Sequence, residues 1–384
     1  MSAGDFRHLF QRSIAAAPGR LHFAAHSHHL WPDASYVGQI AAWEDAARLA
    51  DRKWERVMGE LWPAAQHHVA DELKLPDPAS VVFSSNTHDF LLRIASAIAE
   101  RPLRLLSGDG EFHSFRRQAA RWVEAGEAEW RTVAGGAGMG GKLAEAARAY
   151  EPHLIIASHV GFSTGAIAED LAEVAALCRP EGPWLVVDGY HGFMALESDF
   201  AALAPRAFYT GGGYKYAMAG EGCAFLHAPP GYAARPVATG WYAEFDDLSL
   251  PPGAVGYAPD ARRLLGSTFD PSGLYRFVAV RDCLASEGLT TAAISAHCAA
   301  LKAQFLSGIE GTALAGAEVL NPAAAEEPQA RFVALRHADA PRWQAELMDA
   351  DVVTDVRGDV LRLGFGLYQT ARDVDALLGE VARL

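Results

Sequence analysis

From about residue 80, the sequence alternates short apolar runs with longer amphipathic stretches, and this alternation constrains the fold more than any other feature. Strands that alternate with helices form a mostly parallel sheet with helices on both faces. Ligands of such sheets collect at the carboxyl ends of the strands. The function is therefore expected in the loops that follow these runs. The runs are VVF (81–83), LRLLSG (103–108), EWRTV (129–133), HLIIASHV (153–160), WLVVDG (184–189), AFYTGG (207–212) and CAFLHA (223–228).

A tract rich in proline and glycine at 251–273 marks a boundary in the chain. We place a large domain at 55–262, and a smaller α/β domain at 1–54 plus 263–384, in which the N-terminal segment completes the fold. Beyond the tract the sequence predicts helices at about 274–286 and 291–307, strands in RFVALRH and DVLRLGFG, and a last helix in ARDVDALLGEVARL.

Charge and cysteine content exclude several classes of protein. The net charge is −14 and no lysine or arginine run occurs, so nucleic acid and anionic membranes are not expected partners. The four cysteines are widely spaced and form no CxxC pair, which argues against disulfides and a zinc site. Neither a signal peptide nor a stretch of about 20 apolar residues is present. We expect a cytoplasmic protein.

A single lysine, Lys215, lies in the glycine-rich segment TGGGYKYAMAGEG (210–222). A lysine amine is a nucleophile when burial or a neighbouring cation lowers its pKa, and it can then form a Schiff base. The glycines would leave room for a flat molecule against the amine. The alternative is a solvated loop lysine.

The segment LVVDGYHGFM places Asp188 at the end of an apolar run and His191 three residues later. A carboxylate there could keep a pyridine nitrogen protonated, which makes the ring an electron sink. The alternative is an aspartate that caps a turn. His191 could reach the same ring or lie beneath the loop. No further ligands stand at metal-site spacing, so no metal is expected.

Two further segments supply an anion site and a stacking ring. Asn86 and Thr87 follow a run and open a helix, where backbone N–H groups could hold a phosphate; ordinary helix capping is the alternative. Phe112 and His113 follow the next run, where an aromatic face could cover a flat ring; for Phe112 the alternative is a core position.

Near the C-terminus, Arg362 stands between strand hydrophobes in DVLRLGFG. Its planar fork matches a carboxylate; the alternative is the open face of an edge strand. A nucleophilic lysine, a strand-end acid, a phosphate site, a stacking aromatic ring and a carboxylate fork are together what a pyridoxal phosphate (PLP) enzyme requires.

A competing motif, GAGMGGK at 136–142, matches nucleotide-binding patterns. A P-loop requires Ser or Thr after the lysine, and Leu143 stands there. A dinucleotide fold requires an acid about 20 residues later, where the next run ends in Ser158 and His159. Because both required residues are missing, a nucleotide-dependent enzyme is a rival hypothesis and not the first one.

Over most of its length the sequence resembles the class V aminotransferase superfamily of fold-type I PLP enzymes, and kynureninase in particular. The segments that carry the likeness are LHFAAHSHHLWP, SHVGFSTGAI, WLVVDGYHGFMALESDF, FYTGGGYKYAMAGEGCAFL, VATGWYAEF and RLGFGLYQTARDV. The resemblance implies a large domain with a mostly parallel seven-stranded sheet between helices and a smaller C-terminal α/β domain.

The resemblance also implies roles for single residues. Lys215 would form the Schiff base with PLP, Asp188 would pair with the pyridine nitrogen, and His191 would lie near the ring oxygen or phosphate. Tyr214 would contact the phosphate and is a candidate general acid. Asn86 and Thr87 would bind the phosphate, Phe112 or His113 would cover the ring, Trp241 would line the site, and Arg362 would bind the substrate carboxylate.

A homodimer is the expected unit, because Ser267 and Thr268 would reach the phosphate of a neighbouring subunit. The sequence departs from kynureninases at the substrate side. His26, His28 and His29 replace Asn, Leu and Gly, and Phe162 replaces a tyrosine. His26, His28 and Phe162 are therefore candidate substrate contacts. Cysteine desulfurases of the superfamily use a loop cysteine in the C-terminal domain, but no cysteine follows Cys298.

We expect a PLP enzyme that acts on a small α-amino acid. The first hypothesis for the reaction is kynureninase-like hydrolytic cleavage of the β–γ carbon bond, which releases alanine. The second is transamination to a keto acid. Outside this class stand the nucleotide-binding enzyme and a family member that binds PLP or another ligand without turnover.

Overall fold

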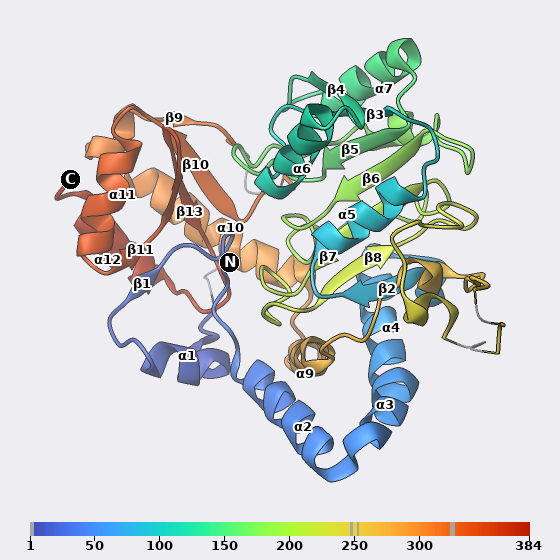
Figure 1. Cartoon of the computed structure of the whole chain (residues 1–384). Helices are drawn as coiled ribbons and strands as arrows, with labels where there is room; N and C mark the ends of the chain where they lie inside the picture. The colour runs from blue at the N-terminus through green and yellow to red at the C-terminus, as the bar shows by residue number, and fades with distance from the viewer. Residues whose placement is uncertain (1–3, 246–248, 252, 323–326) are drawn as a thin grey trace.

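The computed structural model describes residues 4–245, 249–251, 253–322 and 327–384 (Figure 1). Its largest sheet has seven strands in the order β2-β8-β7-β6-β5-β3-β4. β8 pairs antiparallel with both neighbours, and the other pairings are parallel, so the prediction of a mostly parallel seven-stranded sheet is confirmed. The strands are β2 (Val81–Ser84), β3 (Leu103–Gly108), β4 (Ala128–Val133), β5 (Leu154–Ser158), β6 (Trp184–Asp188), β7 (Ala207–Gly212) and β8 (Ala224–His227).

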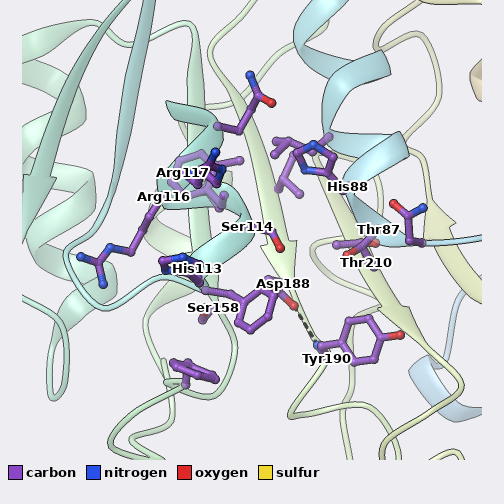
Figure 2. A pocket seen from close by; sticks show the side chains of 18 of the residues that line it. Thr87, His88, His113, Ser114, Arg116, Arg117, Ser158, Asp188, Tyr190 and Thr210 are labelled. Carbon is purple, nitrogen blue, oxygen red and sulfur yellow. Dashed lines mark hydrogen bonds between the residues drawn. The ribbon is translucent and has the colours of Figure 1, made fainter. Parts of the chain in front are cut away.

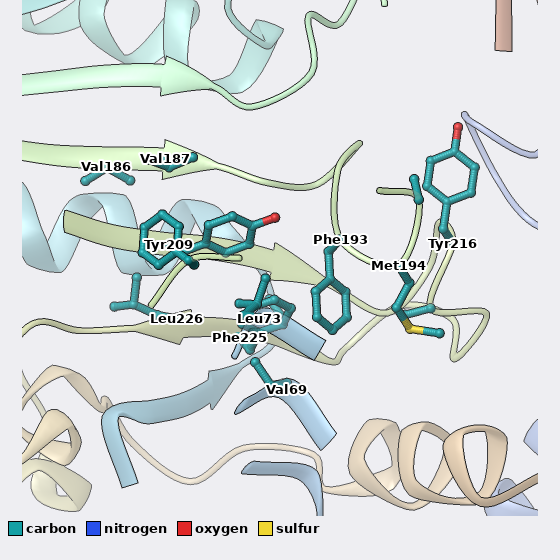
Figure 3. Close-up of a cluster of buried hydrophobic side chains, with 14 of the residues drawn as sticks. Val69, Leu73, Val186, Val187, Phe193, Met194, Tyr209, Tyr216, Phe225 and Leu226 are labelled. Atoms are coloured by element: carbon teal, nitrogen blue, oxygen red, sulfur yellow. The ribbon is translucent and has the colours of Figure 1, made fainter. Parts of the chain in front are cut away.

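Helices follow the strands in the expected alternation and leave the strand ends on one edge. The connecting helices are α5 (Thr87–Ser96), α6 (His113–Glu124), α7 (Met139–Tyr150) and the short α8 (Leu171–Ala175). Because side chains alternate across a strand, the two faces of β6 and β7 pack against different layers of the molecule. Tyr209 and Phe225 pack with Val69 and Leu73 of α4 (Trp62–Leu73) in the core (Figure 3).

The smaller sheet is antiparallel, in the order β12-β13-β10-β9, and carries the C-terminal helices. The N-terminal segment contacts this part of the molecule: β1 (Leu21–His22) pairs with β11 (Val352–Val353), and Ala24 bridges to Gly364. The other elements are β9 (Glu318–Val319), β10 (Phe332–Arg336), β12 (Asp355–Arg357), β13 (Val360–Gly364), α10 (Thr291–Gly308), α11 (Ala340–Asp349) and α12 (Ala371–Val381).

Two long helices connect the parts. α2 (Asp33–Leu49) packs along α9 (Ser272–Ser286), and Gly38 allows the approach because a Cβ there would lie 2.6 Å from the carbonyl oxygen of Tyr275. α1 (Gln11–Ala15), α3 (Lys53–Arg56) and the π-helical turn Val57–Leu61 complete the N-terminal region. The division into 55–262 and 1–54 plus 263–384 stays a prediction. Among the described residues, no helix has the length and apolar character needed to cross a membrane.

Candidate active site

A cavity of about 1170 Å³ opens where the parallel strands end, between the first turns of α5 and α6 (Figure 2). This is the edge of the sheet at which the sequence predicts ligands. Nine of the predicted site residues line it: Asn86, Thr87, Phe112, His113, Phe162, Asp188, His191, Tyr214 and Lys215.

Lys215 is buried beside this cavity, with only 4% of its surface exposed. Its Nζ lies 2.7 Å from Nε2 of His191. Burial lowers the pKa of Lys215 to about 7, although the nearby Asp188 carboxylate acts in the opposite direction. A large part of the amine is therefore neutral near pH 7 and can act as a nucleophile. The structure excludes the alternative of a solvated loop lysine.

Three aromatic rings surround the amine of Lys215. Its Nζ lies 5.7 Å from the ring centroid of Phe112, 5.1 Å from that of Tyr190 and 5.7 Å from that of Tyr214. The rings of Tyr190 and Tyr214 are themselves 4.8 Å apart. Burial raises the pKa of Tyr214 to about 12, so its hydroxyl keeps its proton at neutral pH and can donate it.

Asp188 ends β6 and lies on the floor of the cavity. The backbone N–H of Tyr190 donates to its Oδ1 at 2.9 Å (Figure 2). Burial raises the pKa of Asp188, while that N–H and the Lys215 charge oppose the rise. A cationic partner in the cavity would favour the charged form of Asp188, and the pairing with a pyridine nitrogen stays a prediction.

His191 is neutral, because burial and then the Lys215 charge hold its pKa well below the ordinary value. When Lys215 donates to Nε2, the ring proton lies on Nδ1. This Nδ1 is buried and has no hydrogen-bond partner within the described ranges. A buried donor without an acceptor is costly, so this atom marks a place for a ligand acceptor beside the amine.

At the start of α5, the two interpretations of Asn86, a helix cap and part of a phosphate site, are compatible. Its Oδ1 accepts from the backbone N–H of Asp89 at 3.0 Å, so Asn86 caps the helix. The other N–H groups of the first turn have no acceptor within the helix. Because Asn86 and Thr87 both line the cavity, an anion bound there would meet these groups.

The glycines beside Lys215 have a different purpose from the predicted one. A Cβ at Gly212 would lie 2.1 Å from the hydroxyl of Tyr190, and a Cβ at Gly220 would lie 2.3 Å from the ring of Trp31. A Cβ at Gly213 would lie 2.8 Å from the Gly220 carbonyl. The prediction that these glycines make room for a flat ligand is therefore wrong. They make room for the chain's own side chains and backbone.

Arg362 is buried behind the cavity and does not line it. Its Nη1 donates to the carbonyl oxygen of Phe162 at 2.6 Å, and its Nη2 pairs with Asp355. The ring of Phe162, which does line the cavity, lies 4.5 Å from the guanidinium carbon. Within the described part of the chain, Nε of Arg362 has no partner. The guanidinium thus retains donors for an anion, but Phe162 covers it.

The three histidines near the N-terminus do not converge. His26 is fully buried, its Nε2 lies 3.6 Å from Oδ2 of Asp355, and burial lowers its pKa to about 3. His28 is half exposed and lies 3.5 Å from Glu221. The Nδ1 of His29 contacts the Leu30 carbonyl at 2.7 Å. His26 therefore lies beside Arg362, whereas His28 lies at the outer side of Tyr214, against whose ring it stacks.

Six predicted residues do not line the cavity of this chain: Arg362, His26 and His28, described above, and Trp241, Ser267 and Thr268. Trp241 is 41% exposed and packs on Tyr242 and Phe245. Ser267 and Thr268 are exposed on the surface. The nucleotide motif also lies elsewhere: Lys142 donates to the carbonyl of Ala137 at 3.2 Å.

Sequence reasoning missed Tyr190, Glu111, Ser158 and Asp355. Tyr190 stands between the two residues that were selected, Asp188 and His191, and its aromatic ring was the available signal. Asp355 is paired with Arg362 by the register of β12 and β13, which the turn at 358–359 sets. Glu111 precedes Phe112 and is buried, which no local pattern indicates.

Comparison with known proteins agrees with the resemblance. A model of the kynureninase C-terminal domain matches residues 294–380. Isopenicillin N epimerase from Streptomyces clavuligerus is 31% identical over 230 residues, which span 57% of this chain and 57% of the epimerase.

Solved structures show the fold. A cystine C-S lyase in complex with its reaction product, cysteine persulfide, superimposes with a TM-score of 0.79 at 18% identity, over 96% of this chain and 99% of the lyase. Another structure of that lyase, with glycine covalently linked to its PLP cofactor, has a TM-score of 0.79 at 16% identity, over 99% of each chain. A cysteine desulfurase from Thermococcus onnurineus has a TM-score of 0.79 at 16% identity, over 100% of this chain and 99% of that one. The fold is that of fold-type I PLP enzymes.

Proposed function

From the premise that this chain resembles the class V aminotransferase superfamily in sequence and has the fold-type I architecture, we propose that it is a PLP-dependent enzyme acting on a small α-amino acid. One observation carries the proposal. The buried Lys215 amine, whose pKa is lowered to about 7, lies near the strand-end Asp188 in one cavity.

The donor set fits PLP. The Lys215 amine is suited to a Schiff base with the aldehyde, and Asp188 to a hydrogen bond with the pyridine nitrogen. The first turn of α5, with Asn86 and Thr87, suits the phosphate. The ring of Phe112 suits a contact with the cofactor face. When bound, PLP supplies an electron sink that stabilises negative charge at the substrate α-carbon.

The chain's own residues then move protons and hold the substrate. Neutral Lys215 takes the α-proton, and His191, 2.7 Å away, accepts a hydrogen bond from the ammonium that results. Tyr214 keeps its hydroxyl proton and can donate it. Arg362 binds the substrate carboxylate once Phe162 moves aside, and His26 contributes to that wall of the pocket.

For the reaction itself, we propose kynureninase-like hydrolysis of the β–γ carbon bond. The match of residues 294–380 to the kynureninase C-terminal domain supports this choice over transamination. A persulfide mechanism lacks its nucleophile: Cys178, Cys223 and Cys298 are buried, Cys283 is partly buried, and none of the four lines the cavity. These free thiols also suit the cytoplasmic location that we propose.

A homodimer with a shared phosphate site completes the proposal. Ser267 and Thr268 are exposed in the single chain, which leaves them free to reach the cavity of a second copy.

The proposal is tested by spectra and products. Purified protein reconstituted with PLP should show the visible absorbance of the covalently bound cofactor, and Lys215→Ala should abolish it. Incubation with kynurenine and a panel of amino acids, followed by product analysis, separates the reactions. Alanine supports hydrolysis, a keto acid would favour transamination, and an inverted α-carbon would favour epimerisation. A protein without cofactor absorbance would contradict the whole proposal.

A further inference from the structure

A buried glutamate, Glu111, lies outside the predicted site, and a single residue separates it from the floor of the cavity. Glu111 follows β3 and directly precedes α6, and only 3% of its surface is exposed. Its Oε1 accepts from the backbone N–H of Ser158 at 3.1 Å, and its Oε2 lies 2.5 Å from Oγ of Ser158. Both carboxyl oxygens therefore contact the same serine.

Ser158 connects Glu111 to the cavity. It ends β5, and the parallel register places it directly beside Asp188 at the end of β6. Both residues line the cavity, and Figure 2 shows them on adjacent strand ends. Glu111 thus contacts the strand neighbour of Asp188, and the Asp188 charge is near enough to raise the pKa of Glu111.

Two carboxylates this close to each other in a poorly solvated region do not both ionise readily. Burial raises the pKa of Asp188, but a backbone N–H donor and the nearby Lys215 charge favour its charged form. Burial first and then the Asp188 charge raise the pKa of Glu111, and the donors that oppose the rise are neutral, from Ser158 and the Gly108 backbone. On the side of α7, Met139, which does not ionise, flanks the same spot beside Gly108. Of the two carboxyl groups, Glu111 is therefore the one that holds a proton.

We propose that Glu111 is a positioning residue that holds this proton, so that Asp188 stays the ionised carboxyl on the cavity floor and Ser158 turns its hydroxyl hydrogen towards the cavity. When Glu111 is protonated, it donates to Oγ of Ser158, whose own hydrogen is then free to donate into the site. When Glu111 ionises, Ser158 donates back to it and offers only lone pairs to the cavity. Burial raises the pKa of Glu111 to about 7, so both states are accessible near neutrality.

The inference rests on the proposed PLP function for its consequence, but its first test does not need the cofactor. Infrared difference spectra of the apoprotein should contain a protonated-carboxyl band that disappears as the pH rises through about 7. Glu111→Gln should remove the band, and Glu124→Gln, which changes an exposed carboxylate on α6, should leave it. A band that survives in Glu111→Gln, or that is already lost well below pH 7, would overturn the assignment.

Ser158→Ala provides a second measurement if Glu111→Gln fails to fold. It removes one of the hydrogen bonds that favour the carboxylate form of Glu111, so the band should titrate at a higher pH than in the wild type. An unchanged or lowered midpoint would contradict the role of Ser158.

The holoenzyme tests the consequence for the site. In Glu111→Gln no negative charge can develop at this position, so the midpoint of the pH-dependent visible absorbance should move to lower pH. The value of kcat should fall by a larger factor than KM changes. Glu111→Asp should restore part of both. An upward shift would contradict the inference. Absence of cofactor absorbance in the wild type would contradict the proposed function instead, and the apoprotein titration would still decide the role of Glu111.

Discussion

Asp355 and Arg362 stand directly opposite each other on β12 and β13, and their side chains form an ion pair behind Phe162. The guanidinium that is expected to bind the substrate carboxylate is thus already neutralised by the protein. Because Arg362 is 1% exposed and Asp355 is also largely covered, this pair affects both folding and binding.

The first prediction separates these two effects. Arg362→Gln should lower the free energy of unfolding by roughly 3 kcal/mol, because it leaves the Asp355 carboxylate without its counter-ion. Adding Asp355→Asn should restore most of the stability but not the substrate KM. Denaturant unfolding and steady-state kinetics of both variants provide the measurement. If the double variant regained the wild-type KM, Arg362 would not bind the carboxylate.

The second prediction concerns the nucleophile. Lys215→Ala should lose the cofactor absorbance, and kcat should fall roughly 10²- to 10⁴-fold, the usual contribution of a general base. Lys142→Ala is the matched control, because Lys142 belongs to the nucleotide motif, does not line the cavity, and donates to the Ala137 carbonyl. Equal losses in the two variants would contradict the role of Lys215.

The third prediction follows from the pKa of Lys215, which is lowered to about 7. Only the neutral amine attacks an aldehyde, so the rate at which the apoprotein captures PLP should rise with pH and level off above about 7. The Asp188 carboxylate raises this pKa, so Asp188→Asn should move the midpoint to lower pH. Stopped-flow absorbance at a series of pH values measures both. A midpoint near 10 would show that the amine is not desolvated.

The fourth prediction tests the correction on the glycine segment. Gly212→Ala would place a Cβ 2.1 Å from the Tyr190 hydroxyl, and such overpacking typically costs about 1–3 kcal/mol. Combining it with Tyr190→Ala removes both the hydroxyl and the ring carbon that would lie 2.5 Å from the new Cβ, so the double variant should lose less stability than the two single changes added together. Thermal unfolding of the single and double variants checks this. A neutral Gly212→Ala would mean that Tyr190 moves away without cost.

The fifth prediction concerns the shared phosphate site. Thr268→Val should weaken PLP binding about tenfold or more, the effect expected from losing a hydrogen bond to a charged group. Co-expressed with Lys215→Ala, it should regain activity, because a hybrid dimer has one site with both residues intact. Activity that stays at the level of the weaker parent would argue against a site built from two subunits.

The sequence predicted the local elements and the strand-end residues well. Runs such as LRLLSG correspond to β3 at 103–108, and the helices at 274–286 and 291–307 correspond closely to α9 and α10. Parallel strands end on the same edge, so Asp188 and Thr87 were expected in one cavity and both line it. Trp241 does not line the cavity of the single chain, because its place depends on packing against Tyr242 and Phe245.

By itself, the sequence determined the alternation of strands and helices and placed a lysine at 215 and an acid at 188 in the segments that follow apolar runs, since periodicity and residue type are local properties. Only the tertiary structure decided that Lys215 is buried, that Arg362 is covered by Phe162, that Tyr190 occupies the space above Gly212, and that Glu111 contacts Ser158 on the strand beside Asp188. These relations depend on strand register and on which side chains share a buried space, and residues far apart in the chain create both.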